Sequence, residues 1–157
     1  MVAVVAAIFG HAAAAAEIAV PAAAGPLQAV VDASSPGDVL RLARGEHLGP
    51  VVISTALTLQ GEPGAVLKGS GLGSVVTLEA PDTVVRGLRI EGSGTDIDTL
   101  DAGVFAAPAA ERALIEGNSI VGNLYGIQIH GSRDAVARGN FIEGQRQGRT
   151  NRSGNGV

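Results

Sequence analysis

Three aspartates that lie close together are the first residues that could do chemistry. Asp96, Asp98 and Asp101 offer three carboxylates in one short segment, and Ca²⁺ binds oxygen ligands on flexible loops. An EF-hand loop counted from Asp96 requires Glu at its twelfth position, where this sequence has Ala107. Two interpretations therefore stay open: a calcium loop, or a solvated acidic loop inserted between structural repeats.

Two histidines are the other candidate metal ligands. Cu(I) prefers sulfur and Cu(II) prefers imidazole, and the chain has no Cys and, apart from Met1, no Met. His47 follows Gly45-Glu46, which we interpret as a polar turn, and His130 follows a strand predicted for residues 126–129. The alternative for both is a surface histidine in a loop.

Motifs for common kinds of catalysis are absent from the sequence. No Gly-x-Ser-x-Gly segment is present, and the Gly-rich segment 64–70 lacks the lysine of a phosphate-binding loop. The net charge is −4 without a run of basic residues, which argues against nucleic acid as a partner. We therefore predict a protein that is not an enzyme, with no catalytic or cofactor-binding residue and no bound cofactor.

A repeated sequence segment determines the predicted fold. The segment LIEGNSI at residues 114–120 returns as VARGNFI at residues 136–142, and an earlier copy, VVRGLRI, lies at residues 84–90. The earlier copy is separated from the next by more than one repeat. An inserted loop at residues 92–101 explains this excess, because insertions in repeat proteins fall in loops. A further strand recurs in phase at residues 103–105, 126–129 and 156–157.

A repeat as long as the distance from residue 114 to residue 136, with two or three short strands in each repeat, favours a solenoid over a sandwich. Aliphatic residues suit its narrow interior, and the chain has no Trp, one Tyr and three Phe. We predict an all-β, right-handed parallel β-helix of the pectate-lyase type. A short helix at residues 26–33 is expected to cap its first coil. The recurring Arg86, Arg89, Arg112 and Arg138 are expected to pair with Glu91, Glu116 or Glu143 on the surface.

Two asparagines are expected to stack at one corner of the solenoid. Asn118 and Asn140 each follow a glycine and lie one repeat apart. Amides in such positions can bond to one another along the axis. We therefore predict a structural ladder here.

The segment 1–16 is typical of a secretion signal. An apolar run is followed by Ala14-Ala15-Ala16, which fits a small-x-small cleavage site between Ala16 and Glu17. The run is too short to span a bilayer, so no membrane span is predicted. We expect residues 17–157 to form the β-helix, and since Gly156-Val157 reads as the middle of a strand, we expect further coils in a complete protein.

Several segments together resemble the NosD family of periplasmic β-helix proteins. These are LQAVVDASSPGD at 27–38, GPVVI at 49–53, LTLQG at 57–61, VVRGL at 84–88, DAGVF at 101–105 and LYGI at 124–127. The resemblance covers about Leu27 to Val157. It implies an N-terminal fragment of a periplasmic protein that assists copper-site maturation of nitrous oxide reductase during denitrification.

The resemblance also implies partners. These are the ATPase and membrane subunits of an ABC transporter, a copper chaperone and the reductase itself. Copper is implied for the pathway, but no family metal ligand transfers to a residue of this chain. The alternative is a carbohydrate-active or carbohydrate-binding β-helix, of the lyase or epimerase type. A lyase requires clustered carboxylates or a calcium site beside a basic residue, and convergence of Asp96, Asp98 and Asp101 with an arginine on one face would favour it.

Overall fold

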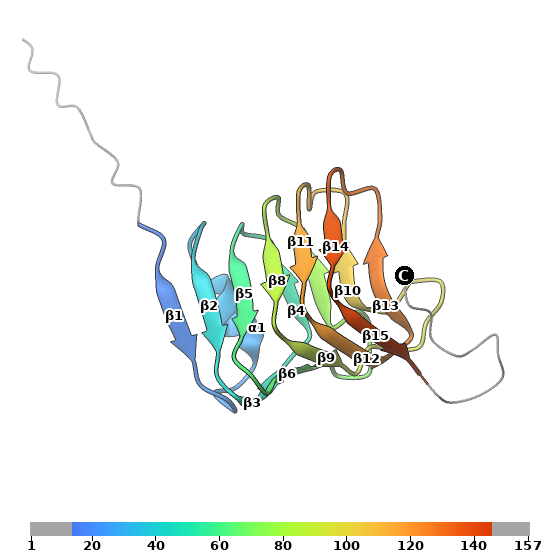
Figure 1. Cartoon of the computed structure of the whole chain (residues 1–157), viewed down its shortest axis with the longest axis horizontal. Helices are drawn as coiled ribbons and strands as arrows, with labels where there is room; N and C mark the ends of the chain where they lie inside the picture. Colours follow the sequence, from blue (N-terminus) through green and yellow to red (C-terminus); the bar gives the residue numbers. More distant parts are fainter. Residues whose placement is uncertain (1–13, 146–157) are drawn as a thin grey trace, which may run out of the picture.

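The computed structural model describes residues 14–145, which form a β-solenoid with three sheets (Figure 1). Sheet A has six strands in the order β1 (Glu17–Val20), β2 (Val39–Leu42), β5 (Thr58–Gly61), β8 (Val84–Arg86), β11 (Leu114–Glu116) and β14 (Val136–Arg138). Sheet B has β3 (Gly45–Leu48), β6 (Ala65–Lys68), β9 (Arg89–Glu91), β12 (Ser119–Asn123) and β15 (Phe141–Gly144). Sheet C has β4 (Val51–Ile53), β7 (Val76–Leu78), β10 (Ala102–Ala106) and β13 (Tyr125–Ile129).

Every strand pair between these elements is parallel. From β2 to β13 the chain visits sheets A, B and C in turn, so each of these coils adds one strand to each sheet and stacks on the coil before it. Ile115 is the register partner of Ala137 in the next coil and of Val85 in the coil before. The extra chain between Val85 and Ile115 includes the loop that joins β9 to β10. The predicted parallel solenoid and its inserted loop are therefore confirmed.

The interior is aliphatic because alternate residues of each strand point inward. In sheet A the inward column contains Leu40, Leu59, Val85 and Ile115, each with no exposed surface. These residues are register partners of one another. Burying this continuous stack is the main driving force that holds the coils together.

Helix α1 (Leu27–Asp32) takes the place of a sheet C strand in the first coil and lies against β4. It buries Leu27 and Val31, and Pro26 precedes it as the N-terminal cap residue. The predicted capping helix is therefore confirmed.

Two strands were not predicted. Strand β1 pairs with β2, although its residues were interpreted only as the start of the chain after cleavage. Strand β3 contains His47, so the polar turn predicted there is wrong. The strand predicted at residues 156–157 lies outside the described residues, as do residues 1–13 of the predicted signal.

Candidate functional site

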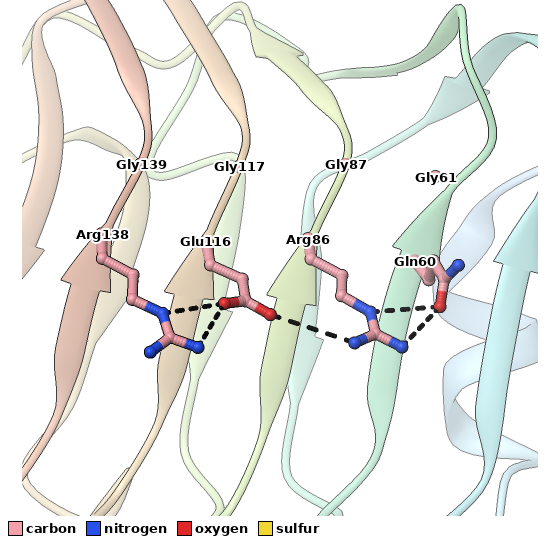
Figure 2. A pocket seen from close by; sticks show the side chains of 8 residues that line it. All are labelled: Gln60, Gly61, Arg86, Gly87, Glu116, Gly117, Arg138 and Gly139. Atoms are coloured by element: carbon pink, nitrogen blue, oxygen red, sulfur yellow. Dashed lines mark hydrogen bonds and ion pairs between the residues drawn. The ribbon is translucent and has the colours of Figure 1, made fainter.

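A shallow groove of about 500 Å³ runs along the outer face of sheet A, where that sheet turns into sheet B (Figure 2). Four successive strands supply its polar side chains, and a glycine follows each of these side chains. The lining residues are Gln60, Gly61, Arg86, Gly87, Glu116, Gly117, Arg138 and Gly139. The groove therefore follows the solenoid axis and crosses one coil after another.

The polar side chains of the groove are register partners and bond to one another across the coils (Figure 2). Arg86 donates to Oε1 of Gln60 from Nε at 3.1 Å and from Nη2 at 2.8 Å. Arg138 donates to Oε2 of Glu116 at 2.9 and 2.8 Å, while Arg86 lies 3.9 Å from the other oxygen of Glu116. One carboxylate is thus shared by two guanidiniums.

Glycines leave the corner of the groove open. Gly87, Gly117 and Gly139 all have φ between 62° and 68°, a left-handed conformation that glycine adopts without steric cost. A Cβ atom at Gly117 would have no neighbour within 4 Å, whereas one at Gly61 would lie 2.5 Å from the carbonyl oxygen of Gly87. The left-handed backbone conformation therefore favours glycine at Gly117, whereas the close stacking of coils favours it at Gly61.

The asparagines lie directly after these glycines. Asn118 is 2% exposed, accepts the Leu88 N–H at 3.1 Å and donates to the Val85 carbonyl oxygen at 3.0 Å. Its Nδ2 also donates to Oδ1 of Asn140 at 3.0 Å. The two amides bond along the axis and tie the corner of each coil to the previous one.

A third asparagine, Asn123, ties two coils together at the corner between sheets B and C. This role was not predicted from the sequence. Asn123 is 1% exposed, accepts the Ser93 N–H and donates to the Ile90 carbonyl oxygen, both at 3.0 Å. The signal was present, because Asn123 follows Gly122 just as Asn118 follows Gly117.

The predicted acidic loop lies between β9 and β10. Asp101 is buried, and its carboxylate accepts the Asp96 N–H at 3.0 Å and the Thr99 hydroxyl at 2.7 Å. Asp96 in turn accepts the Asp98 N–H at 2.9 Å. Two of the carboxylates thus hydrogen-bond within the loop, while Asp98 is exposed.

Beside this loop lies a pocket of about 480 Å³. Asp96 and Asp101 line it together with Leu72, Gly73, Ser74, Thr77, Thr99 and Phe105, but Asp98 does not. None of these lining residues is basic. In this pocket the three aspartates therefore do not converge with an arginine, the arrangement that would have favoured a lyase or epimerase.

The two histidines are far apart. His47 is buried inside β3, where Nε2 lies 2.8 Å from the Ala43 carbonyl oxygen, so the expected surface loop is wrong. His130 is exposed after β13 and stacks on Phe105 at 6.0 Å between ring centroids. Three coils separate them, about 14 Å at ~4.8 Å per coil, so they cannot ligate one ion.

Within residues 14–145, no group of three or more His, Cys, Asp or Glu side chains is placed to hold a metal ion. In the same part of the chain, no helix is long and apolar enough to cross a membrane.

A second set of ion pairs lies at the corner between sheets C and A. Arg112 donates to both carboxylate oxygens of Asp82 at 2.7 Å, and the bonded guanidinium holds the pKa of Asp82 below its ordinary value. Arg133 holds the pKa of Glu111 low in the same way. Arg112 thus pairs with Asp82 and Glu111 rather than with the predicted glutamates, whereas Arg89 pairs with Glu91 as predicted.

The residues of the predicted cleavage site are part of the first coil. The Ala16 N–H donates to Oδ1 of Asp38 at 2.8 Å, and the Ala16 carbonyl oxygen accepts the Val39 N–H at 2.8 Å. Glu17 begins β1 and pairs with Arg41 at 2.6 Å.

Comparison with known proteins yields two curated relatives, while no family model matches the chain. The chain is 39% identical over 117 residues to a probable ABC transporter binding protein NosD of Stutzerimonas stutzeri. It is 38% identical over 116 residues to the protein of the same name from Pseudomonas aeruginosa. Each match covers 74% of this chain but 27% of the relative. Together with the parallel solenoid, these matches confirm the resemblance found in the sequence, and over the matched segment the chain belongs to the NosD family.

Proposed function

We propose that this chain is part of a periplasmic accessory protein that works with an ABC transporter and assists copper-site maturation of nitrous oxide reductase. The similarity to two proteins named as ABC transporter binding proteins supports the proposal. The protein acts by binding its partners and not by catalysis, and copper is the cargo of the pathway.

The sheet A groove is the surface that contacts a partner. Its strands are held by stacked aliphatic residues and by the asparagine corners, so the groove presents its side chains in a fixed geometry. The side chains of Arg86 and Arg138 are 45% and 65% exposed, and arginine is enriched where proteins meet.

The chemistry of the groove favours an acidic segment of the partner. Among the residues that line the groove, Arg86 and Arg138 are basic and Glu116 is acidic, so the lining carries one positive charge in excess, although the whole chain has a net charge of −4. An incoming carboxylate can form paired hydrogen bonds with a guanidinium. Acidic segments of the transporter subunits, a copper chaperone or the reductase are the partners that we propose.

The experiment is done in the host with the complete gene. Deletion is expected to abolish nitrous oxide reduction and to yield copper-deficient reductase, and the intact gene is expected to restore both. The complete gene carrying Arg86→Gln and Arg138→Gln should restore neither fully, at a normal protein level. Arg133→Gln is the matched control, because Arg133 is 77% exposed but lies at the other corner.

The role in maturation and the assignment of the groove as the contact surface can be contradicted separately. Normal reductase activity and copper content in the deletion strain would show that the protein has no role in maturation. Full restoration by the double variant, equal to that by Arg133→Gln, would show that the groove is not the contact surface.

A further inference from the structure

Asp38 is a buried carboxylate that holds the beginning of the described chain. It is 4% exposed, and its two oxygens accept N–H groups from Ala16 and Ser35, both at 2.8 Å. The Ser35 bond is local to the turn that precedes β2. The Ala16 bond joins the turn to the segment that leads into β1.

The geometry distinguishes between neighbouring cleavage positions. The Ala16 carbonyl oxygen accepts the Val39 N–H and so points toward β2. Because a trans peptide unit is planar, the Glu17 N–H points away from β2. An amino group created at Glu17 would therefore face the open edge of β1, and both bonds of Ala16 would be lost.

Cleavage one residue earlier retains every bond. The Ala16 nitrogen would stay 2.8 Å from Asp38 and would become an ammonium group facing a buried carboxylate. Ala13 and Ala15 also satisfy the small-x-small requirement of signal peptidases. A charge-assisted hydrogen bond of this kind is about twice as strong as a neutral one.

We infer that a signal peptidase hydrolyses the Ala15–Ala16 peptide bond, and that the new Ala16 ammonium group forms an ion pair with Asp38. Water adds its hydroxyl group to the Ala15 carbonyl carbon and one proton to the Ala16 nitrogen as the C–N bond breaks. The new carboxylic acid then gives its proton to the amine, which leaves a carboxylate on Ala15 and an ammonium group on Ala16. The mature chain then begins one residue before the position that the alanine pattern alone predicts. This inference rests on the proposed export of the protein.

The first test is the mass of the protein recovered from the host periplasm. Intact mass and N-terminal sequencing are expected to show Ala16 as the first residue. A mature protein that begins at Ala15, Glu17 or any other residue would overturn the inference while leaving export intact. Intact protein found only in the cytoplasm would overturn both the inference and the proposed periplasmic function.

The second test measures the ion pair without relying on export. Two chains are released from a cleavable fusion, one beginning at Ala16 and one with a single extra glycine before Ala16. The first is expected to have an unfolding equilibrium constant about tenfold smaller at pH 7, corresponding to a rise of about one unit in the amine pKa. The difference should fade as the pH rises through the raised pKa of the amine, about one unit above its ordinary value of roughly 8, because the folded amine then loses its proton.

Asp38→Asn provides the control, because it retains an acceptor for the Ala16 nitrogen but removes the charge. With this substitution the two chains should be equally stable at all pH values. Equal stability of the two chains that carry Asp38 would overturn the ion pair, even if the periplasmic protein began at Ala16.

Discussion

The side-chain amide of Gln28 pairs with both backbone groups of Val52. Nε2 of Gln28 donates to the Val52 carbonyl oxygen at 3.0 Å, and Oε1 accepts the Val52 N–H at 2.7 Å. A primary amide carries the same donor and acceptor as a peptide unit, so Gln28 acts in place of a neighbouring strand. Helix α1 therefore closes the first edge of sheet C, which would otherwise be open to pairing with another chain.

Replacement of Gln28 by alanine is expected to lower the free energy of unfolding by about 1–2 kcal/mol. The variant loses three exposed hydrogen bonds, two to the backbone of Val52 and one to Asp32, each worth roughly 0.5 kcal/mol, the low end of the usual range. Urea unfolding followed by circular dichroism measures the change. Gln28→Glu should also destabilise the protein, since a carboxylate cannot donate to Val52. The control is Gln128→Ala, on the outer face of β13, and an equal loss there would contradict the capping role.

The sequence predicted the coils because their signal is repeated along the chain. The aliphatic inward columns and the Gly-Asn corners recur with the same spacing, so several copies identify each other. Strand β3 escaped prediction because His47 takes an inward position that other coils fill with Leu67 or Ile90. The alternation of apolar and polar residues is thereby hidden.

The groove could be predicted only in part. Pairing of Arg86 and Arg138 with a glutamate was expected, and both contact Glu116. Gln60 precedes Arg86 by a spacing that differs from the one between Glu116 and Arg138. The place of Gln60 in the groove depends on the register between strands. Loops of unequal length set that register, and the sequence repeat does not reveal it.

Asn118→Asp should destabilise the protein by about 3 kcal/mol or more at neutral pH, because a buried charge and lost donor bonds both oppose folding. The new carboxylate accepts the Leu88 N–H but cannot donate to Val85 or Asn140. Asn118→Leu should be milder, because Leu88 occupies the corresponding corner one coil earlier. Chemical denaturation ranks the two variants by their free energy of unfolding. An aspartate variant more stable than the leucine variant would contradict the ladder.

Acid should weaken the ion pair between Asp82 and Arg112. The Arg112 guanidinium lowers the pKa of Asp82 from its ordinary value of 3.8. A carboxyl whose pKa is lowered by folding adds stability above its unfolded pKa, and this stability is lost as the pH falls through the folded pKa. Asp82→Asn, which tolerates the left-handed backbone of this position, should therefore be less stable than wild type at pH 7.

The difference in stability between wild type and Asp82→Asn should shrink below pH 3.8. It should also fall at high salt, since the ion pair is exposed. Unfolding curves at neutral and strongly acidic pH, at low and at high concentrations of NaCl, measure both effects. A difference that is the same at both pH values would show that Asp82 acts through its backbone conformation and not through its charge.

Two glycines of the groove should respond differently to alanine, because different physical requirements keep them. At Gly61 the new Cβ would meet the Gly87 carbonyl oxygen at 2.5 Å, and neither backbone can move without separating stacked coils. At Gly117 the space is open, and only the left-handed φ of 62° opposes a side chain. Gly61→Ala should therefore cost about 3 kcal/mol or more, and Gly117→Ala about 1–2 kcal/mol.

Gly117→Asn separates conformation from space, since asparagine accepts the left-handed region more readily than alanine. It is expected to be more stable than Gly117→Ala, although its side chain is larger. Because Gly117 lines the groove and a Cβ there has no neighbour within 4 Å, the same variant is also expected to obstruct the proposed contact surface. Urea unfolding of the three variants provides the order, and a cost at Gly117 equal to that at Gly61 would show that the groove is less open than the geometry indicates.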